Sequence, residues 1–195
     1  RSGVARAQIP VTDAANITQS IVNSVTELVQ TSTTAENMIG NFKETMKIYR
    51  QGKEYYDRLR NVTHLVRDAR KVQQSILLVG ELSDIYVTSY DKMLTDDNFS
   101  SQELSAIAAG YNKLMERGMN SLKDLKEIVN PTDYSMTDKE RLDRIDQAHG
   151  ELTHTRDLMV YYTRKNISVS YLRSQRKNDT QRVLDLYGSA DEKYW

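Results

Sequence analysis

The chain has 195 residues, of which 38% are hydrophobic, and its 27 basic and 27 acidic side chains cancel. This balance argues against a polycation that binds nucleic acids over its whole surface. The absence of cysteine excludes disulfides, thiolate zinc sites and iron–sulfur clusters. Two prolines, eight glycines and 28% charged residues favour a water-exposed helical protein.

The first residues contain a pattern that is typical of signal-peptide cleavage. In GVARAQ, Ala5 and Ala7 stand two positions apart before Gln8, as small residues do at a signal-peptidase site. The pattern predicts an exported protein, periplasmic or on the cell surface, cleaved after Ala7. Residues 1–7 would then be the signal-peptide remnant within an N-terminal tail of residues 1–12. The alternative is that the small residues are coincidental.

The first long element is predicted over residues 13–60. From Ile17 to Leu59 one set of positions advances by four and three in turn, the spacing that keeps one helix face against a neighbour. Thr12 or Asp13 can cap its start. Such a helix would be about 70 Å long, so its partners must also be long.

Residues 62–95 break that spacing. They read as two shorter helices separated near Gly80, a residue that often ends helices, and closed by the polar stretch TDDN. We expect them to form a small helical appendage over about residues 62–99. Asp96 and Asp97 lack the ligand spacing of an EF-hand, so a solvated turn is the expected role of both.

Two further helices have clear start signals. Ser100 and Glu103 form a predicted capping box before an apolar face that runs to Val129, and Pro131 ends that helix. Thr137 and Glu140 form a second capping box. The last long helix then continues through residues 161–178, although its β-branched residues are also compatible with a strand, and Gly188 ends the final turn.

The predicted fold is therefore all-α. It is an elongated bundle of three long helices with a small helical appendage inserted after the first. Residues 13–187 form a single domain, followed by a C-terminal tail over residues 188–195. Gly52 and Gly118 fall on helix seams, where we expect them to make room for a neighbouring side chain.

No pattern in the chain predicts catalysis or cofactor binding. The glycines stand alone and form no phosphate-binding loop. His149 and His154 are five positions apart and face different sides of a helix, which does not suit shared metal ligation. Asp143 and Asp146 lie among basic residues early in a helix, where ion pairing explains them better than acid–base catalysis. We expect no enzyme activity, cofactor, metal or small-molecule substrate.

The segment YYTRKNISVSYLRSQRKN, residues 161–178, has five basic side chains and no acidic one. On a helix, Arg164 points away from the other four cations, which share their sector with Tyr162 and Val169. A phosphate-binding stripe would keep its cations together and separate from apolar residues, so this arrangement argues against one. Solvated helix edges, an acidic protein partner, an anionic membrane and, least favoured, nucleic acid remain alternatives. The candidate partner-binding residues are Arg164, Lys165, Tyr171, Arg173, Arg176, Lys177 and Trp195.

Six segments resemble the TraI family of Bacteroidetes conjugative transposons, which is distinct from the relaxase of the same name, and the resemblance runs in order from about Gln8 to Trp195. They are NFKETMKIYRQGKEYYD, DARKVQQSILLVGELSDIYV, FSSQELSAIAAGY, MTDKERLDRID, YYTRKNISVSYLRSQRKND and RVLDLYG with EKYW. The resemblance implies an exported part of a conjugative type IV secretion apparatus, with minor pilins as the architectural analogue. The family has no known catalytic motif, so the resemblance implies no catalytic residues.

The expected function is thus a structural component of a DNA-transfer machine that contacts other subunits through residues 62–99 or 161–178. Self-association is also open. Charge reversal at Arg173, Arg176 and Lys177 is expected to impair assembly and to leave the fold intact. The alternative is an accessory factor that binds nucleic acid or a membrane surface through the basic segment 161–178.

Overall fold

A computed structural model of the chain describes residues 19–26, 32–60, 68–129 and 136–189. Every regular element within these ranges is an α-helix, so the predicted all-α class is confirmed. Residues 19–26 are helical, and the longer elements are α2 (Ser32–Arg60), α3 (Asp68–Leu94), α4 (Ser101–Val129), α5 (Asp138–Arg176) and α6 (Thr180–Tyr187).

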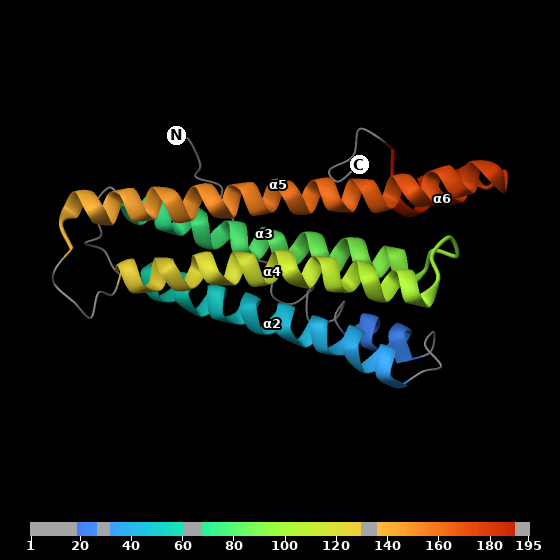
Figure 1. Cartoon of the computed structure of the whole chain (residues 1–195), viewed down its shortest axis with the longest axis horizontal. Coiled ribbons are helices and arrows are strands. Elements are labelled where there is room, and N and C mark those ends of the chain that lie inside the picture. The colour runs from blue at the N-terminus through green and yellow to red at the C-terminus, as the bar shows by residue number, and fades with distance from the viewer. Residues whose placement is uncertain (1–18, 27–31, 61–67, 130–135, 190–195) are drawn as a thin grey trace, which may run out of the picture.

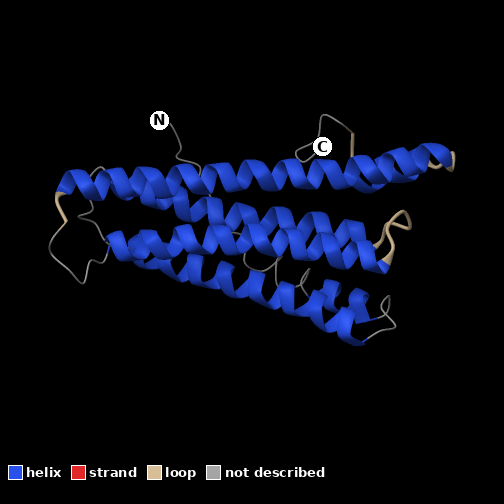
Figure 2. Ribbon diagram, in the orientation of Figure 1, coloured by secondary structure: helices blue, strands red, loops and turns tan. Residues whose placement is uncertain are grey.

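The long helices lie side by side in an elongated bundle (Figure 1). α3 and α4 pack against each other and against both α2 and α5, which flank them on opposite sides. Each long helix runs back along the one before it, and α6 folds back against the end of α5 (Figure 2). α5 is therefore an outer helix, with one face on the bundle and one face free of the other long helices.

The structure corrects the predicted appendage. Residues 68–94 form one uninterrupted helix that passes through Gly80 and packs inside the bundle as a full-length neighbour of α2, α4 and α5. Among the side chains described in α3, only those of Arg70 and Gln74 are exposed. A helix covered on most sides lacks the one-sided apolar spacing of a surface helix. This explains why the seven-residue apolar spacing is interrupted in this region although the helix is continuous.

The first predicted helix is described in two parts, residues 19–26 and α2. Figure 1 draws the first part beside the opening turns of α2 and off its axis, so the seam does not follow a single straight rod. Ile21 and Val25 are fully buried in the hydrophobic core. A rod of about 70 Å would have outrun α3 and α4, which have 27 and 29 residues.

An aromatic stack fills the centre of the core. The Tyr86 ring lies 5.0 Å from that of Phe42 and 4.7 Å from that of Tyr111, and the Tyr162 ring meets Tyr111 edge-on at 5.0 Å. Tyrosine hydroxyls in the core form hydrogen bonds within the bundle. The Tyr90 hydroxyl, for example, donates to the Leu104 carbonyl at 2.7 Å. Burial of such rings stabilises the fold by about 1.5–3 kcal/mol each.

The predicted role of the seam glycines is confirmed for Gly118 and not for Gly52. A Cβ atom on Gly118 would lie 2.8 Å from Leu82 Cδ1, and one on Gly52 would lie 3.4 Å from Val79 Cγ1. Gly118 thus lets Leu82 of α3 approach α4 closely, whereas a Cβ atom on Gly52 would make an ordinary van der Waals contact.

Candidate functional site

The connection between α3 and α4 holds a buried carboxylate. The Asp96 side chain is 0% exposed and accepts hydrogen bonds from the Ser170 hydroxyl, the Tyr187 hydroxyl at 2.7 Å and the backbone N–H of Asn98 at 3.0 Å. The Arg182 guanidinium lies 3.5 Å from the same carboxylate. We call these residues, with Asp96 at the centre, the Asp96 cluster. The prediction of a solvated turn holds for exposed Asp97 and is wrong for Asp96.

A second set of polar contacts borders this cluster and uses two of the predicted partner-binding cations. The Arg173 guanidinium pairs with both carboxylate oxygens of Glu103, at 2.9 and 2.6 Å, and donates to the Asn98 carbonyl at 2.5 Å. The Lys177 ammonium donates to Asn98 Oδ1 at 2.9 Å. Glu103 also accepts from the Ser100 amide and completes the predicted capping box at the start of α4.

The charges explain the acidity of Glu103. Its hydrogen bonds from Arg173 and then from the Ser100 backbone lower its pKa to about 2. The pKa of Arg173 is raised in turn, because Glu103 stabilises the charged guanidinium. In Tyr187, burial raises the phenol pKa and the Asp96 carboxylate raises it further. Tyr187 is therefore a permanent hydrogen-bond donor to Asp96 at any physiological pH.

The polar groups of this region form hydrogen bonds and ion pairs with each other. Together they fasten the α3–α4 connection to the end of α5 and to α6, through residues 74 to 91 positions away from Asp96 along the chain. The carboxylate accepts from several donors at once, which leaves it poorly suited to take a proton from a substrate. The arrangement is that of a structural clasp between helices.

Six of the seven candidate partner-binding residues lie in the described ranges, and they differ in exposure and in contacts. Arg164, Lys165 and Arg176 are exposed on α5. Tyr171 is half-buried against the core. Arg173 and Lys177 hold the loop contacts already described, and Trp195 lies outside the described residues.

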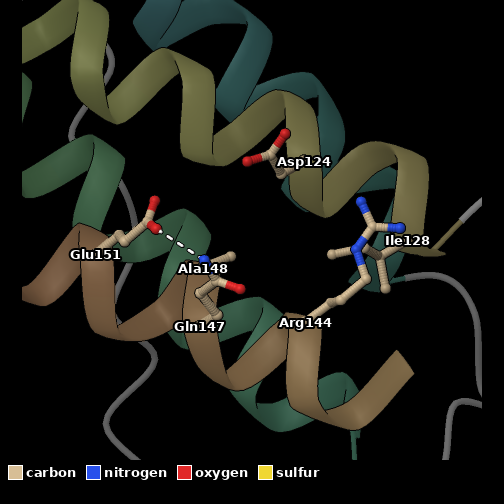
Figure 3. A pocket seen from close by; sticks show the side chains of 6 residues that line it. All are labelled: Asp124, Ile128, Arg144, Gln147, Ala148 and Glu151. Atoms are coloured by element: carbon tan, nitrogen blue, oxygen red, sulfur yellow. Dashed lines mark hydrogen bonds between the residues drawn. The ribbon is translucent and has the colours of Figure 1, made fainter. Parts of the chain in front are cut away.

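A small pocket lies between α4 and α5, near the other end of α5 (Figure 3). Its volume is about 170 Å³, and it is lined by Asp124, Ile128, Arg144, Gln147, Ala148 and Glu151. Glu151 accepts from Gln147 at 3.2 Å and from Ser121 at 3.3 Å. These bonds satisfy the carboxylate from within the protein, so the pocket has the character of a polar gap between two helices.

Histidines and carboxylates do not gather into a metal site anywhere in the ranges that the structure describes. Half-buried His149 has a pKa lowered by burial and by nearby Lys71. Asp146 pairs with Lys71 of α3 rather than with the basic residues of its own helix. None of the helices searched in the described ranges is both long enough and apolar enough to span a membrane.

Comparison with protein families gives a match at the start of the chain. A family model described as a domain of unknown function (DUF4141) matches residues 1–42. That region includes the opening turns of α2 and precedes every residue of the Asp96 cluster. No curated protein and no solved structure matches the chain.

Proposed function

We propose that this protein is a non-enzymatic structural component of a conjugative type IV secretion apparatus, similar in role to a minor pilin. It acts by contacts with other subunits of the transfer machine. The starting point is the resemblance of six ordered segments to the TraI family of conjugative transposons.

The observation in the structure that supports this role best is the form of the bundle. Long helices packed along their whole length make an elongated body with extended outer faces, a form suited to stacking against other subunits. The polar contacts within the bundle stabilise this elongated body, because Asp96 and Glu103 bind side chains of α5 and α6. Fold alone does not assign a role, and a mating experiment with a deletion strain tests this one.

Export is part of the proposal. Cleavage after Ala7, suggested by the Ala5-x-Ala7 pattern, would deliver the protein to the periplasm or the cell surface. Fractionation of cells that express the complete gene, with sequencing of the mature N-terminus, tests this step. A protein that stays in the cytoplasm with its leader attached would contradict it.

The alternative role, an accessory factor that binds nucleic acid or a membrane, rests on the basic segment. Two of its five cations, Arg173 and Lys177, are engaged within the protein. The remaining cations are interleaved with exposed apolar side chains, an arrangement that suits a protein partner better than a phosphate backbone.

The deciding experiment is mating. An in-frame deletion in the donor, complemented from a plasmid, is expected to reduce transfer frequency by several orders of magnitude and to recover with the plasmid copy. Unchanged transfer from the deletion strain would overturn the proposed function. A catalytic role would instead require loss of transfer from a variant that assembles normally.

A further inference from the structure

The exposed apolar side chains of the described residues are unevenly distributed. Four large hydrophobic side chains are exposed: Tyr161 (59%), Leu172 (59%), Leu142 (41%) and Val169 (39%). Three of the four lie in the C-terminal half of α5. At 3.6 residues per turn, Tyr161, Lys165 and Leu172 fall along one line of this helix.

That line lies on the outer face of the bundle. α3 and α4 pack against the opposite face of α5, where Met159, Thr163, Ile167 and Ser170 are buried. The exposed face of the same stretch carries apolar and basic side chains together. We call it the outer strip, and it consists of Tyr161, Arg164, Lys165, Val169, Leu172 and Arg176.

Within the part of the chain that the structure describes, the cations of the outer strip have no acidic partner. Residues 158–178 contain no acidic side chain, and no ion pair joins Arg164, Lys165 or Arg176 to any other residue in the described ranges. The Lys165 ammonium instead lies 5.4 Å from the centre of the Tyr161 ring. Arg173 differs, because it faces the α3–α4 connection and pairs with Glu103. The strip is thus a positive surface with an apolar line through it.

Three kinds of occupant fit this surface poorly. A second copy would bring its own cations against these cations, since the same patch serves both sides of a twofold interface. A phosphate backbone gains nothing from covering Val169 and Leu172. A membrane-bound helix needs a broad apolar face, whereas the outer strip offers three apolar side chains and three cations.

We propose that the outer strip docks one amphipathic helix of another protein, with aliphatic side chains along its contact edge and glutamates or aspartates beside them. The strip spans about 22 Å from residue 161 to residue 176, which matches a partner helix of about 15 residues. Aliphatic side chains would cover Tyr161 and Leu172, and the acids would pair with Arg164, Lys165 and Arg176. This inference rests on the proposed function in one respect, that the protein works through protein contacts.

The test is site-specific photo-cross-linking in mating donor cells. Benzoylphenylalanine replaces Leu172 in the full-length chain, and a matched variant carries it at exposed Lys123 of α4. We expect a cross-link from position 172 that is at least five-fold stronger than from position 123. Mass spectrometry should map it to a helical segment of another protein with at least three acids and an aliphatic edge. No excess cross-linking at 172, or an adduct with lipid, nucleic acid or this same chain, overturns the proposal.

Charge reversal gives a second readout. Arg164→Glu with Lys165→Glu and Arg176→Glu should reduce the cross-link from position 172 at least ten-fold and leave the thermal midpoint of the bundle unchanged. A cross-link of wild-type strength in the triple variant overturns the proposal. The deletion strain separates the two ideas. Normal mating with an acidic helix captured at 172 refutes only the proposed function, whereas lost mating with no capture at 172 refutes only the docking surface.

Discussion

Removal of the Asp96 carboxylate is expected to destabilise the protein more than any single surface change. Asp96→Ala leaves the hydroxyls of Ser170 and Tyr187 and the backbone N–H of Asn98 without their acceptor. Each buried donor without a partner costs about 1–3 kcal/mol, and the desolvation of the carboxylate itself is recovered. The expected net loss of unfolding free energy is about 3 kcal/mol.

The contribution of a single hydrogen bond can be measured in the same place. Tyr187→Phe removes only the hydroxyl that donates to Asp96 at 2.7 Å, so it should cost about 2 kcal/mol, as hydrogen bonds to charged groups do. Because both changes remove the same interaction, the double variant should be less destabilised than the sum of the single variants, by about 1 kcal/mol or more.

Urea unfolding followed by circular dichroism at 222 nm gives these free energies, with Asp97→Ala as the matched control. Asp97 is exposed, so its replacement should change stability by less than about 0.5 kcal/mol. If the cluster mainly fastens α6, the loss will appear locally, as faster amide hydrogen exchange over residues 180–187. An Asp96→Ala protein with wild-type urea stability and unchanged exchange in α6 would refute the reasoning.

The remaining predictions concern acid stability and helix packing. Since the folded pKa of Glu103 is about 2 against an ordinary value of 4.5, its pairing with Arg173 stabilises the fold above about pH 4.5, and this contribution disappears as the pH falls toward 2. The pair is partly exposed, so Glu103→Gln should remove about 1 kcal/mol at pH 7 and little at pH 2, measured by urea unfolding at both values; equal losses at both would contradict the assignment. A Cβ atom on Gly110 would lie 2.2 Å from the Tyr162 hydroxyl, so Gly110→Ala should destabilise by about 1–3 kcal/mol in thermal unfolding. Gly40→Ala, with nothing within 4 Å of the added atom, should stabilise α2 by up to about 1 kcal/mol, and a loss there would contradict the packing.

Local signals in the sequence were sufficient to predict much of the helical structure. The capping box of Ser100 and Glu103 and that of Thr137 and Glu140 are both formed. Gly188, at a φ of 89°, follows α6 as predicted. These features depend on residues three or four positions apart, so the local sequence pattern is enough to predict them.

The features that were not predicted depend on distant contacts. Gly80 reads as a helix end because an exposed glycine weakens a helix by about 1 kcal/mol, and burial of α3 among three helices outweighs that cost. Asp96 reads as solvated because its donors Ser170 and Tyr187 follow it by 74 and 91 positions. Nothing within a turn of Asp96 signals that burial.

The cations of the basic segment 161–178 face two directions, so their replacements should have different effects on stability. Arg173 holds Glu103 and the Asn98 carbonyl, so Arg173→Glu would set a carboxylate against both and should cost about 2–3 kcal/mol of unfolding free energy. Arg176 is exposed and makes no ion pair within the described ranges, so Arg176→Glu should change stability by less than about 0.5 kcal/mol. Simultaneous charge reversal of Arg173, Arg176 and Lys177 would therefore break the contacts with Glu103 and Asn98. A mating defect in that variant could then come from lost stability as well as from impaired assembly. A mating defect in Arg176→Glu at wild-type thermal stability would assign the segment a role beyond its own fold, and wild-type mating in that variant would leave Arg176 without one.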